Sequence, residues 1–586
     1  MATTNAELAR LFRDMAAMLE LTGANRFRVI AHDRVAQALK DLPDDVAKLV
    51  DDPARLEGIE GIGTKSAKKI IEYVRTGKIT EYEELLDVVP EGLLEVRRIP
   101  GLGPKTVKLL WEQGGVTDLP SLQAALDAGT LESLPRMGAK TLENIRASIG
   151  FMSRAGRRTR IGKAMPIAEA IVERLRAVPG TERVEFTGSL RRGRETIGDL
   201  DVLASSTDPH GLSEVFRSMD GVEQILVAGD TKSSVRLAAG LQADLRVVDA
   251  TAYGAALLYF TGSKPHNVAL RERAIKRGYR LNEYGLFPDD GEETPPQQRG
   301  IAPVVSATEA SIYEKLELPY IPPPLREDRG ELAEPPPELI DVGDVRAELH
   351  AHTIASDGRL TIELLVAEAK RRGYDTIAIT DHSRSSVQAN GLSDDRLRTH
   401  IAAVRDVAAQ TDGIRVLAGS EVDILTDGRL DYDDELLSEL DIVVASPHAA
   451  LTQDTEKATR RLLAAIEHPL VDIVGHPTGR VIGRRGGLEP DLPTLVAAAA
   501  EHDTALEVNA NSRRLDLRDT HVRAVVEAGG LIAINTDAHG VEDFDQLRYG
   551  VLTAQRGWLT ADRCINTWAP EAIGAWLARR RGVAAR

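Results

Sequence analysis

The sequence predicts a multidomain protein with an all-α N-terminal region, an α/β middle region and a C-terminal barrel of parallel strands and helices. Three observations support this fold class. At 586 residues the chain is too long for one hydrophobic core. A glycine-rich motif followed by a helical stretch recurs near the N-terminus. In the last third, short apolar strands alternate with helical stretches, as in repeated βα units.

The N-terminal region reads as short helices separated by glycine turns. Its motif occurs as "GIEGIGTKSAKKII", again as "IPGLGPKTVKLL", and more weakly as "LPRMGAKTLENI". Glycines free backbone N–H groups at a helix N-terminus, where the helix dipole favours a phosphate, and a lysine adds charge. One such turn is usually only a tight turn, but three in series favour binding to the phosphate backbone without sequence readout. The expected DNA contacts are Gly61, Gly63, Lys65, Lys68, Gly101, Gly103, Lys105, Gly138 and Lys140.

The middle region carries a candidate site of three carboxylates. In "TGSLRRGRETIGDLDVL", Asp199 and Asp201 lie on the same face of a strand, and "ADLRVV" supplies Asp244 on a neighbouring strand. Three converging carboxylates could hold two Mg²⁺ ions, which prefer oxygen ligands and substrate phosphates. Such a pair can activate an attacking hydroxyl and stabilise a leaving pyrophosphate. The same Asp-x-Asp pattern is common on protein surfaces, so this motif alone does not decide the matter.

A proline-rich acidic segment follows, from Phe287 to about Asp344, and includes "LPYIPPPLREDRGELAEPPPEL". Proline disfavours helix and favours an extended, semi-stiff chain. We therefore expect a spacer here and a domain boundary within residues 326–344.

Polar residues stand at the C-terminal ends of the seven strands expected beyond this spacer, which is where βα barrels place their active sites. His350 and His352 are two residues apart and can reach one ion, as can Asp537 and His539. Imidazole with carboxylate suits Zn, Mn or Fe. A lone histidine at a strand end is usually only a polar cap. So many histidines and acids at corresponding strand ends predict a multinuclear metal site, because one four-ligand zinc ion cannot use them all.

Six other histidines lie mostly on helical patterns, and we interpret them as surface or structural residues: His32, His210, His400, His468, His502 and His521.

The motifs "ELHAHTIASDG", "ITDHS", "GSEVDI", "SPH", "GHP" and "TDAH" resemble those of PHP phosphoesterases, over about residues 345–580. This resemblance implies a distorted (β/α)7 barrel with three ions, Mn²⁺ or Zn²⁺, and Glu421 as a bridge. Clustered divalent ions convert bound water to hydroxide, so phosphodiester hydrolysis is the expected chemistry. The implied ligands are His350, His352, Asp357, His382, Glu421, His448, His476, Asp537 and His539.

The carboxylate motif, with "GS" upstream and "YFTGSKPHNVALRERAIKRGYRLNEYGLF" downstream, resembles family X DNA polymerases of the polymerase beta type. With the helix-hairpin-helix repeats and the PHP motifs, nearly the whole chain resembles bacterial members of that family. The resemblance implies that Asp199, Asp201 and Asp244 hold catalytic Mg²⁺, with Asp244 accepting the primer 3′-OH proton. It also implies a nucleotide site formed by Gly188, Ser189, Arg192, Gly198, Tyr259, Phe260, Gly262, Asn267 and Arg271.

Three positions limit what the resemblance carries over. Val268 replaces a lysine that contacts the template base in the animal enzyme, and Lys264 replaces an acid, so fidelity and nucleotide affinity do not transfer. Lys69 falls where related enzymes keep a Schiff-base lysine that removes 5′-deoxyribose phosphate. A lysine on a basic helix is more often a DNA contact, and both readings of Lys69 stay open.

The resemblance also divides the chain into domains. We expect an 8-kDa-like helical domain (1–85), helix-hairpin-helix fingers (86–155), a nucleotidyltransferase palm (156–252), a thumb-like domain for the nascent base pair (253–325), the linker (326–344) and the PHP domain (345–586).

Composition narrows the partners and the location. The net charge of −17 argues against uniform binding to nucleic acid, but residues 1–160 are nearly balanced, so local patches decide. The single Cys564 excludes an internal disulfide, and "ADRCINTW" predicts a buried thiol on a helix. No membrane span or secretory signal is indicated, so we expect a cytoplasmic, nucleoid-associated monomer.

The leading hypothesis is a repair polymerase that fills short gaps in primed DNA with dNTPs, coupled to a 3′-5′ exonuclease that could also incise at abasic sites. One alternative is a phosphoesterase whose polymerase half only binds DNA. Another is a barrel that acts on a small phosphate monoester, which leaves the backbone-binding repeats without a purpose.

Overall fold

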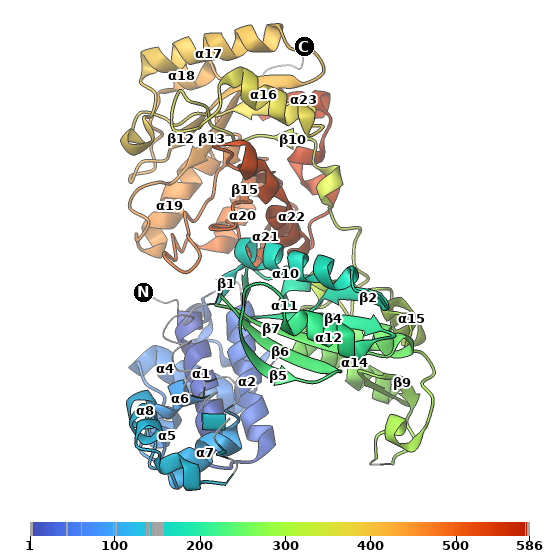
Figure 1. Cartoon of the computed structure of the whole chain (residues 1–586). Coiled ribbons are helices and arrows are strands. Elements are labelled where there is room, and N and C mark those ends of the chain that lie inside the picture. Colours follow the sequence, from blue (N-terminus) through green and yellow to red (C-terminus); the bar gives the residue numbers. More distant parts are fainter. Residues whose placement is uncertain are drawn as a thin grey trace. The chain divides into compact units, whose positions relative to one another are not determined.

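The computed structural model (Figure 1) describes the chain apart from residues 1–3, 43–44, 60, 98, 100–101, 136, 139–140, 143–144, 146–157, 239, 293, 581 and 583–586. The chain forms two compact units, Met1–Arg157 and Arg158–Arg586.

The described residues of the first unit form helices and turns without strands, as predicted. Apolar residues at helical spacing, such as Leu8, Phe12 and Met15, form one core with Ile70 and Leu110 of later helices. Two of the glycine motifs lead into helices that begin directly after Gly63 and Gly103. The helices are α1 (Thr4–Leu21), α2 (Arg26–Asp41), α3 (Pro53–Glu57), α4 (Thr64–Thr76), α5 (Thr80–Leu86), α6 (Leu93–Val96), α7 (Pro104–Glu112) and α8 (Leu119–Asp127).

The second unit begins with the predicted α/β palm. Its five-stranded sheet has the order β2-β4-β7-β6-β5, and only β4 and β7 pair in parallel. The strands are β2 (Thr181–Phe186), β4 (Asp199–Ser206), β5 (Val222–Ala228), β6 (Lys232–Leu237) and β7 (Gln242–Val248). Helices α10 (Ile161–Arg176) and α12 (Pro209–Arg217) bury apolar side chains against this sheet, and the short α11 (Gly188–Arg191) precedes the two-residue strand β3 (Thr196–Ile197), which pairs with β1 (Thr159–Arg160).

The thumb-like region consists of α13 (Tyr253–Thr261), α14 (Lys264–Lys276), the hairpin β8 (Tyr279–Asn282) and β9 (Gly285–Pro288), and α15 (Glu309–Lys315). The proline-rich segment that we expected to be a spacer is packed instead. It contains α15, and Ile312, Ile321 and Leu325 join the core of the thumb-like region. Within the expected linker, Arg326 is fully buried, and Glu309 accepts a hydrogen bond from its NH1 atom at 2.5 Å, which compensates the burial of the charge.

The third part is a barrel of seven parallel strands in chain order. The bridge between Ala351 and Ala538 brings the first and last strands together, so the barrel is nearly closed. The fold class predicted from the alternation of strands and helices is therefore confirmed. The strands are β10 (Ala347–Glu348), β11 (Thr376–Ile379), β12 (Arg415–Asp423), β13 (Ile442–Ser446), β14 (Ile473–Val474), β15 (Ala505–Asn509) and β16 (Ile532–Asn535).

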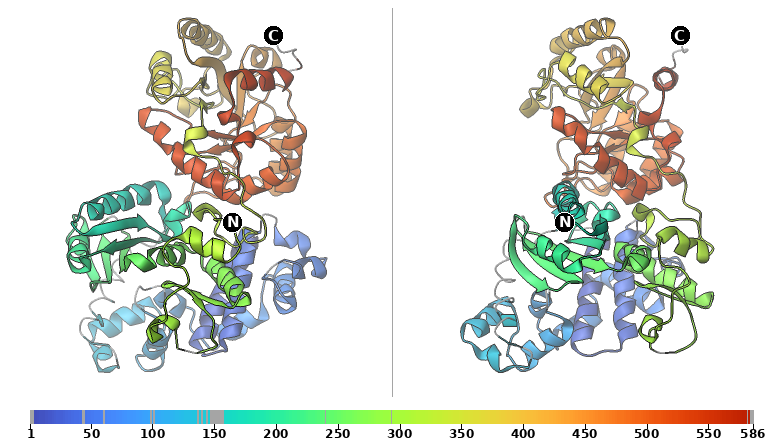
Figure 2. Two further views of the ribbon diagram at one scale, coloured as in Figure 1. Left: turned by 90° about the vertical axis from the view of Figure 1, so that its right-hand side faces the viewer. Right: turned by 45° about the vertical axis from the view of Figure 1, so that its right-hand side comes forward.

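Helices surround these strands on the outside, coloured yellow to red in Figures 1 and 2. They are α16 (Ile362–Arg371), α17 (Asp394–Ala409), α18 (Asp434–Ser438), α19 (Thr455–Ile466), α20 (Leu492–Glu501), α21 (Asp519–Glu527), α22 (Leu547–Arg556) and α23 (Pro570–Arg580). Cys564 is buried as predicted, and burial raises its pKa to about 12. The predicted helix around it is wrong, because Cys564 lies between two 3-10 turns.

The palm and the barrel share a core. Leu515 and Tyr549 of the barrel belong to the same apolar cluster as Ile161 and Leu190 of the palm. None of the described helices combines the length and the apolar character that a bilayer crossing needs.

Candidate functional site

The barrel brings every predicted metal ligand to the carboxyl ends of its strands. His350 and His352 follow β10, His382 follows β11, and Glu421 lies in β12. The other ligands come from segments after β10, β13, β14 and β16: Asp357, His448, His476, Asp537 and His539.

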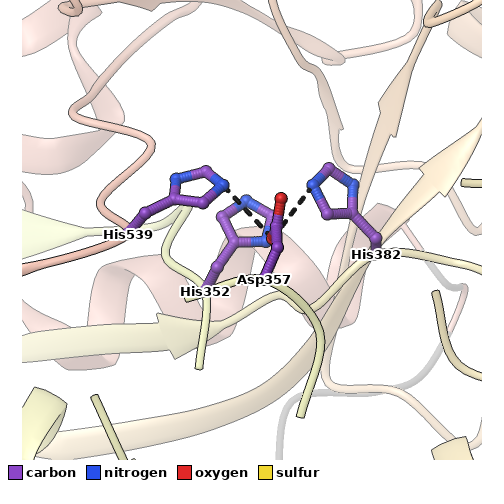
Figure 3. Close-up of side chains that lie close together, drawn as sticks. All are labelled: His352, Asp357, His382 and His539. Atoms are coloured by element: carbon purple, nitrogen blue, oxygen red, sulfur yellow. Dashed lines mark ion pairs between the residues drawn. The ribbon is translucent and has the colours of Figure 1, made fainter. Parts of the chain in front are cut away.

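All of these side chains except His476 fall into three groups whose ligand atoms lie within 4.8 Å of one another. Figure 3 shows the first group, in which His352, His382 and His539 surround Asp357. The second group is His350, His352 and Asp537, and the third is His382, Glu421 and His448. Because His352 and His382 each belong to two groups, the three groups adjoin.

Glu421 is the central carboxylate of the cluster. One of its oxygens lies 2.9 Å from His476 Nε2 and 3.3 Å from both His350 Nε2 and His448 Nε2, and the other lies 2.8 Å from His382 Nδ1. A carboxylate with both oxygens facing separate imidazoles has the geometry of a bridging ligand.

Although imidazole and carboxylate atoms of this cluster lie close together, several buried ones make no hydrogen bond of suitable geometry to the described residues. They are both ring nitrogens of His352, His350 Nε2, His382 Nδ1, His476 Nδ1 and both oxygens of Glu421. Buried polar atoms without partners are costly, and coordination to an ion satisfies them. The mixed nitrogen and oxygen donors therefore fit divalent transition-metal ions or zinc.

Carboxylates behind the ligands orient the imidazoles, and the sequence analysis missed them. Glu507 of β15 accepts a hydrogen bond from His350 Nδ1 at 2.8 Å, and Asp423 of β12 accepts one from His448 Nδ1 at 2.9 Å. Each bond leaves Nε2 directed toward Glu421. The available signal was the period of two along each strand. Asp423 follows Glu421 by two residues, and Glu507 precedes by two residues Asn509, the polar residue that ends β15.

Asp381, which also stands at a strand end, supports a loop instead. It accepts hydrogen bonds from Thr353 Oγ1 at 2.8 Å and Ser356 Oγ at 2.5 Å, and pairs with His400 at 2.8 Å. His400 is therefore structural, as interpreted.

Burial, together with the nearby His382 and His539, lowers the pKa of His352 to about 4, so its imidazole is neutral and able to ligate at neutral pH.

The palm brings together the three predicted carboxylates. The parallel pairing of β4 with β7 sets Asp201 directly opposite Asp244, and the carboxylates of Asp199, Asp201 and Asp244 lie within 4.8 Å of one another. Burial and the neighbouring Asp199 and Asp244 raise the pKa of Asp201 to about 7. Like charges held so close favour a divalent cation between them, and the oxygen donors suit Mg²⁺.

Two neighbours shape this carboxylate site. A Cβ added at Gly188 would lie 2.3 Å from Asp201 Oδ2, so the absence of a side chain at Gly188 lets the carboxylate take its position. Gln242, which the sequence analysis did not single out, donates hydrogen bonds to both oxygens of Asp244, at 3.2 and 3.0 Å.

Most of the other predicted nucleotide contacts lie along α11, α13 and α14, and some of them are linked by hydrogen bonds. Asn267 Nδ2 donates to the Tyr259 carbonyl at 2.7 Å, and Arg271 Nε donates to the Asn267 carbonyl at 3.1 Å. Gly262 lies beside Arg192, since a Cβ there would be 3.2 Å from its NH1 atom. Ser189 lies in α11, Phe260 lies in α13, and Gly198 directly precedes Asp199.

Arg192 belongs to a buried ion-pair network that joins the palm to the barrel. Glu327 accepts hydrogen bonds from Arg192 Nε at 3.1 Å and from Arg556 NH1 at 2.9 Å. Arg556, at the end of α22, also donates to the Arg192 carbonyl at 2.7 Å and pairs with Asp519 at 2.8 Å. Although burial opposes it, the Arg556, Arg192 and Arg194 guanidiniums hold the pKa of Glu327 below its usual range.

In the first unit, the predicted DNA contacts Gly61, Gly63, Lys65, Lys68, Gly103, Lys105 and Gly138 are exposed. Gly101 and Lys140 lie outside the described residues. Lys69 is less exposed than these residues. Its Nζ lies 2.5 Å from Glu81 and 3.5 Å from His32 Nε2.

Comparison with known protein families agrees with this architecture. Residues 3–79 match a helix-hairpin-helix domain, residues 93–150 a SAM-like helix-hairpin-helix tandem, residues 256–327 the DNA polymerase beta thumb, and residues 348–510 the PHP domain.

Comparison with individual proteins is more specific. The chain is 37% identical to the "DNA polymerase/3'-5' exonuclease PolX" of Bacillus subtilis, over 98% of this chain and 99% of that protein. A "Probable phosphatase" of Shewanella sediminis is 30% identical over 40% of this chain and 94% of its own length, and one of Tolumonas auensis is 29% identical over 38% and 89%. Because the first relative is matched from end to end, the chain belongs to the PolX group of family X DNA polymerases that carry a C-terminal PHP domain.

Proposed function

We propose that the protein fills short gaps in DNA by template-directed addition of dNTPs and removes 3′-terminal nucleotides at a second site. The observation that carries this proposal is the presence of two separate clusters with metal-ligand geometry, one in the palm and one in the barrel. The Bacillus subtilis relative bears both activities in its name, which supports the pairing.

In the palm, Asp199, Asp201 and Asp244 would hold Mg²⁺. The ion would reduce the electrostatic repulsion that opposes attack of the primer oxygen on the α-phosphate. Asp244 would accept the proton of the primer 3′-OH, and Gln242 fixes its carboxylate by donating to both oxygens. Gly188, Ser189, Arg192 and Gly198 would meet the triphosphate. Tyr259, Phe260 and Gly262 would border the sugar, and Asn267 and Arg271 the nascent base pair.

In the barrel, the clustered histidines and acids would hold three ions, Mn²⁺ or Zn²⁺, which supply a hydroxide and neutralise the developing charge on a phosphodiester. Glu507 and Asp423 keep the imidazoles of His350 and His448 directed at Glu421. Incision at abasic sites would need no further residues, because it is hydrolysis of the same bond type.

Lys69 would act as a DNA contact rather than as a Schiff-base nucleophile. Its Nζ pairs with Glu81 at 2.5 Å, and an amine held in an ion pair is not free to attack a sugar carbon. The expected partners are gapped or primed DNA and dNTPs. We further propose that the protein works as a monomer in the cytoplasm, associated with the nucleoid.

Primer extension tests this proposal against its rival, a phosphoesterase whose polymerase half only binds DNA. The purified protein, given a gapped primer-template, dNTPs and Mg²⁺, should add nucleotides. It should shorten the same primer when dNTPs are omitted and Mn²⁺ is supplied. Shortening without any incorporation would favour the rival.

A further inference from the structure

Two loops of the barrel carry an arginine patch, which we define as Arg484, Arg485, Arg513 and Arg514. The first loop lies between β14 and α20 and begins near the metal ligand His476. The second lies between β15 and α21. Because β14 and β15 are parallel neighbours, both loops leave the same end of the barrel as the metal ligands.

The arginine patch is not neutralised by the protein. Among the described residues, no ion pair joins any of its four members to an acidic side chain, and Arg484, Arg485 and Arg513 are exposed. Asp516 is the acid near Arg485, and it already accepts a hydrogen bond from Thr478 Oγ1 at 2.9 Å. Burial, and then repulsion from Arg514 and Arg484, lowers the pKa of Arg485. Unneutralised clustered cations are unusual in a chain with a net charge of −17.

The loops that carry the arginine patch are held in place. Ile482 N donates to the Arg513 carbonyl at 2.8 Å, which ties one loop to the other. Arg485 donates from Nε and NH2 to the Gly479 carbonyl, at 2.9 and 2.6 Å. The positive φ values of Gly479 (63°) and Gly483 (75°) permit the tight course of the first loop.

The same loops are also anchored on the palm. Arg480, at the start of the first loop, pairs with Glu195 at 2.7 Å. Ser512 of the second loop packs so closely on Gly162 that a Cβ on that glycine would lie 2.1 Å from Ser512 Oγ. The arginine patch therefore sits on a rigid junction between palm and barrel, beside the strand ends that carry the metal ligands.

We propose that the arginine patch binds the phosphate backbone of the DNA strand whose 3′ end enters the barrel's metal cluster. Phosphates would relieve the mutual repulsion of the guanidiniums, and each guanidinium can bind a phosphate through two parallel hydrogen bonds. The inference rests on the proposed exonuclease function and adds to it the surface that distinguishes a DNA strand from a small phosphate ester.

The test compares the double variant Arg513→Gln/Arg514→Gln and the single variant Arg484→Gln with the full-length wild type. Degradation of a labelled single-stranded oligonucleotide is measured at several salt concentrations, beside hydrolysis of bis(4-nitrophenyl) phosphate. The double variant should lose about tenfold or more in kcat/KM on the oligonucleotide, because it removes charge-assisted hydrogen bonds to phosphate. The slope of log(kcat/KM) against log[salt] should fall by roughly 0.7 for each phosphate contact removed.

Two controls separate the outcomes. Arg460→Gln removes an exposed arginine that pairs with Glu456 at 3.7 Å, and it should leave the salt slope unchanged. The charge-preserving variant Arg513→Lys/Arg514→Lys should retain most of the slope. Equal losses on the oligonucleotide and on the small diester would place the effect in the metal cluster and overturn the inference, as would an unchanged salt slope. A wild type that degrades no DNA would instead refute the proposed exonuclease.

Discussion

Glu507 offers the sharpest test of how the barrel holds its metal ions. This buried carboxylate accepts three hydrogen bonds: from His350 Nδ1 at 2.8 Å, from the His476 backbone N–H at 2.6 Å and from Asn535 Nδ2 at 2.9 Å. In Glu507→Gln, one oxygen becomes an NH₂ group that can only donate, so it faces either the two donors that bond Oε1, from His350 and Asn535, or the His476 N–H that bonds Oε2. The side chain of His350 or the backbone of His476 must then turn away.

The expected cost follows from the role of such supporting carboxylates, whose loss typically lowers metal affinity or activity by about 10- to 100-fold. We therefore expect Glu507→Gln to lose metal during dialysis, measured by inductively coupled plasma mass spectrometry, and to degrade DNA about 10- to 100-fold more slowly. Primer extension should be unaffected, because the hydrogen-bond partners of Glu507 all belong to the barrel. Wild-type metal content together with wild-type degradation would refute the argument that Glu507 orients the ligands.

Three further predictions concern the palm. Gly188→Ala should displace the Asp201 carboxylate, which a Cβ would approach to 2.3 Å, and should slow primer extension by about 100-fold while sparing degradation; full extension activity would contradict the steric argument. Arg556→Met removes one of the two guanidiniums that donate to Glu327, so Glu327 should hold the Arg192 guanidinium more tightly. Because Arg192 is the proposed triphosphate contact, the KM for dNTP should rise about tenfold with kcat nearly unchanged. Arg548→Met, which breaks a different palm–barrel ion pair, with Glu169, should leave KM unchanged. Because the pKa of Asp201 is raised to about 7, the metal-free folded state binds more protons than the unfolded state between about pH 4 and 7. Asp201 therefore contributes a loss of stability across that window as pH rises, and Asp201→Asn should make stability fall less over pH 4 to 7 than in the wild type in thermal melts with chelator; an identical pH dependence in both proteins would contradict the shift.

Strand periodicity explains why so much of both candidate metal sites was visible in the sequence. Residues two apart on a strand face the same side, so His350 with His352 and Asp199 with Asp201 could be paired from the sequence alone. The order of the barrel strands follows from the alternation of strands and helices. Whether the separate motifs meet depends on that order, and the parallel register that sets Asp201 opposite Asp244 confirms the expected neighbour.

The parts that the sequence analysis missed depend on partners far away in the chain. Arg326 and Glu327 stand in a proline-rich acidic stretch that reads locally as a spacer, yet both are buried. Their partners are Glu309 and Arg556, and nothing in the local sequence indicates the second of these, 229 residues away. Glu507 was missed for a related reason, since a single acid in an apolar strand shows its role only when the imidazole that it orients is in place.

The proposed function requires one chain to hold two independent metal-dependent sites. The most direct measurement follows both elongation and shortening of one labelled, gapped primer-template with Mg²⁺ and Mn²⁺, using Asp201→Ala and Glu421→Ala beside the wild type. Asp201→Ala should abolish elongation and spare 3′-5′ degradation, whereas Glu421→Ala should do the reverse. Loss of both activities in either variant would contradict the two-site account.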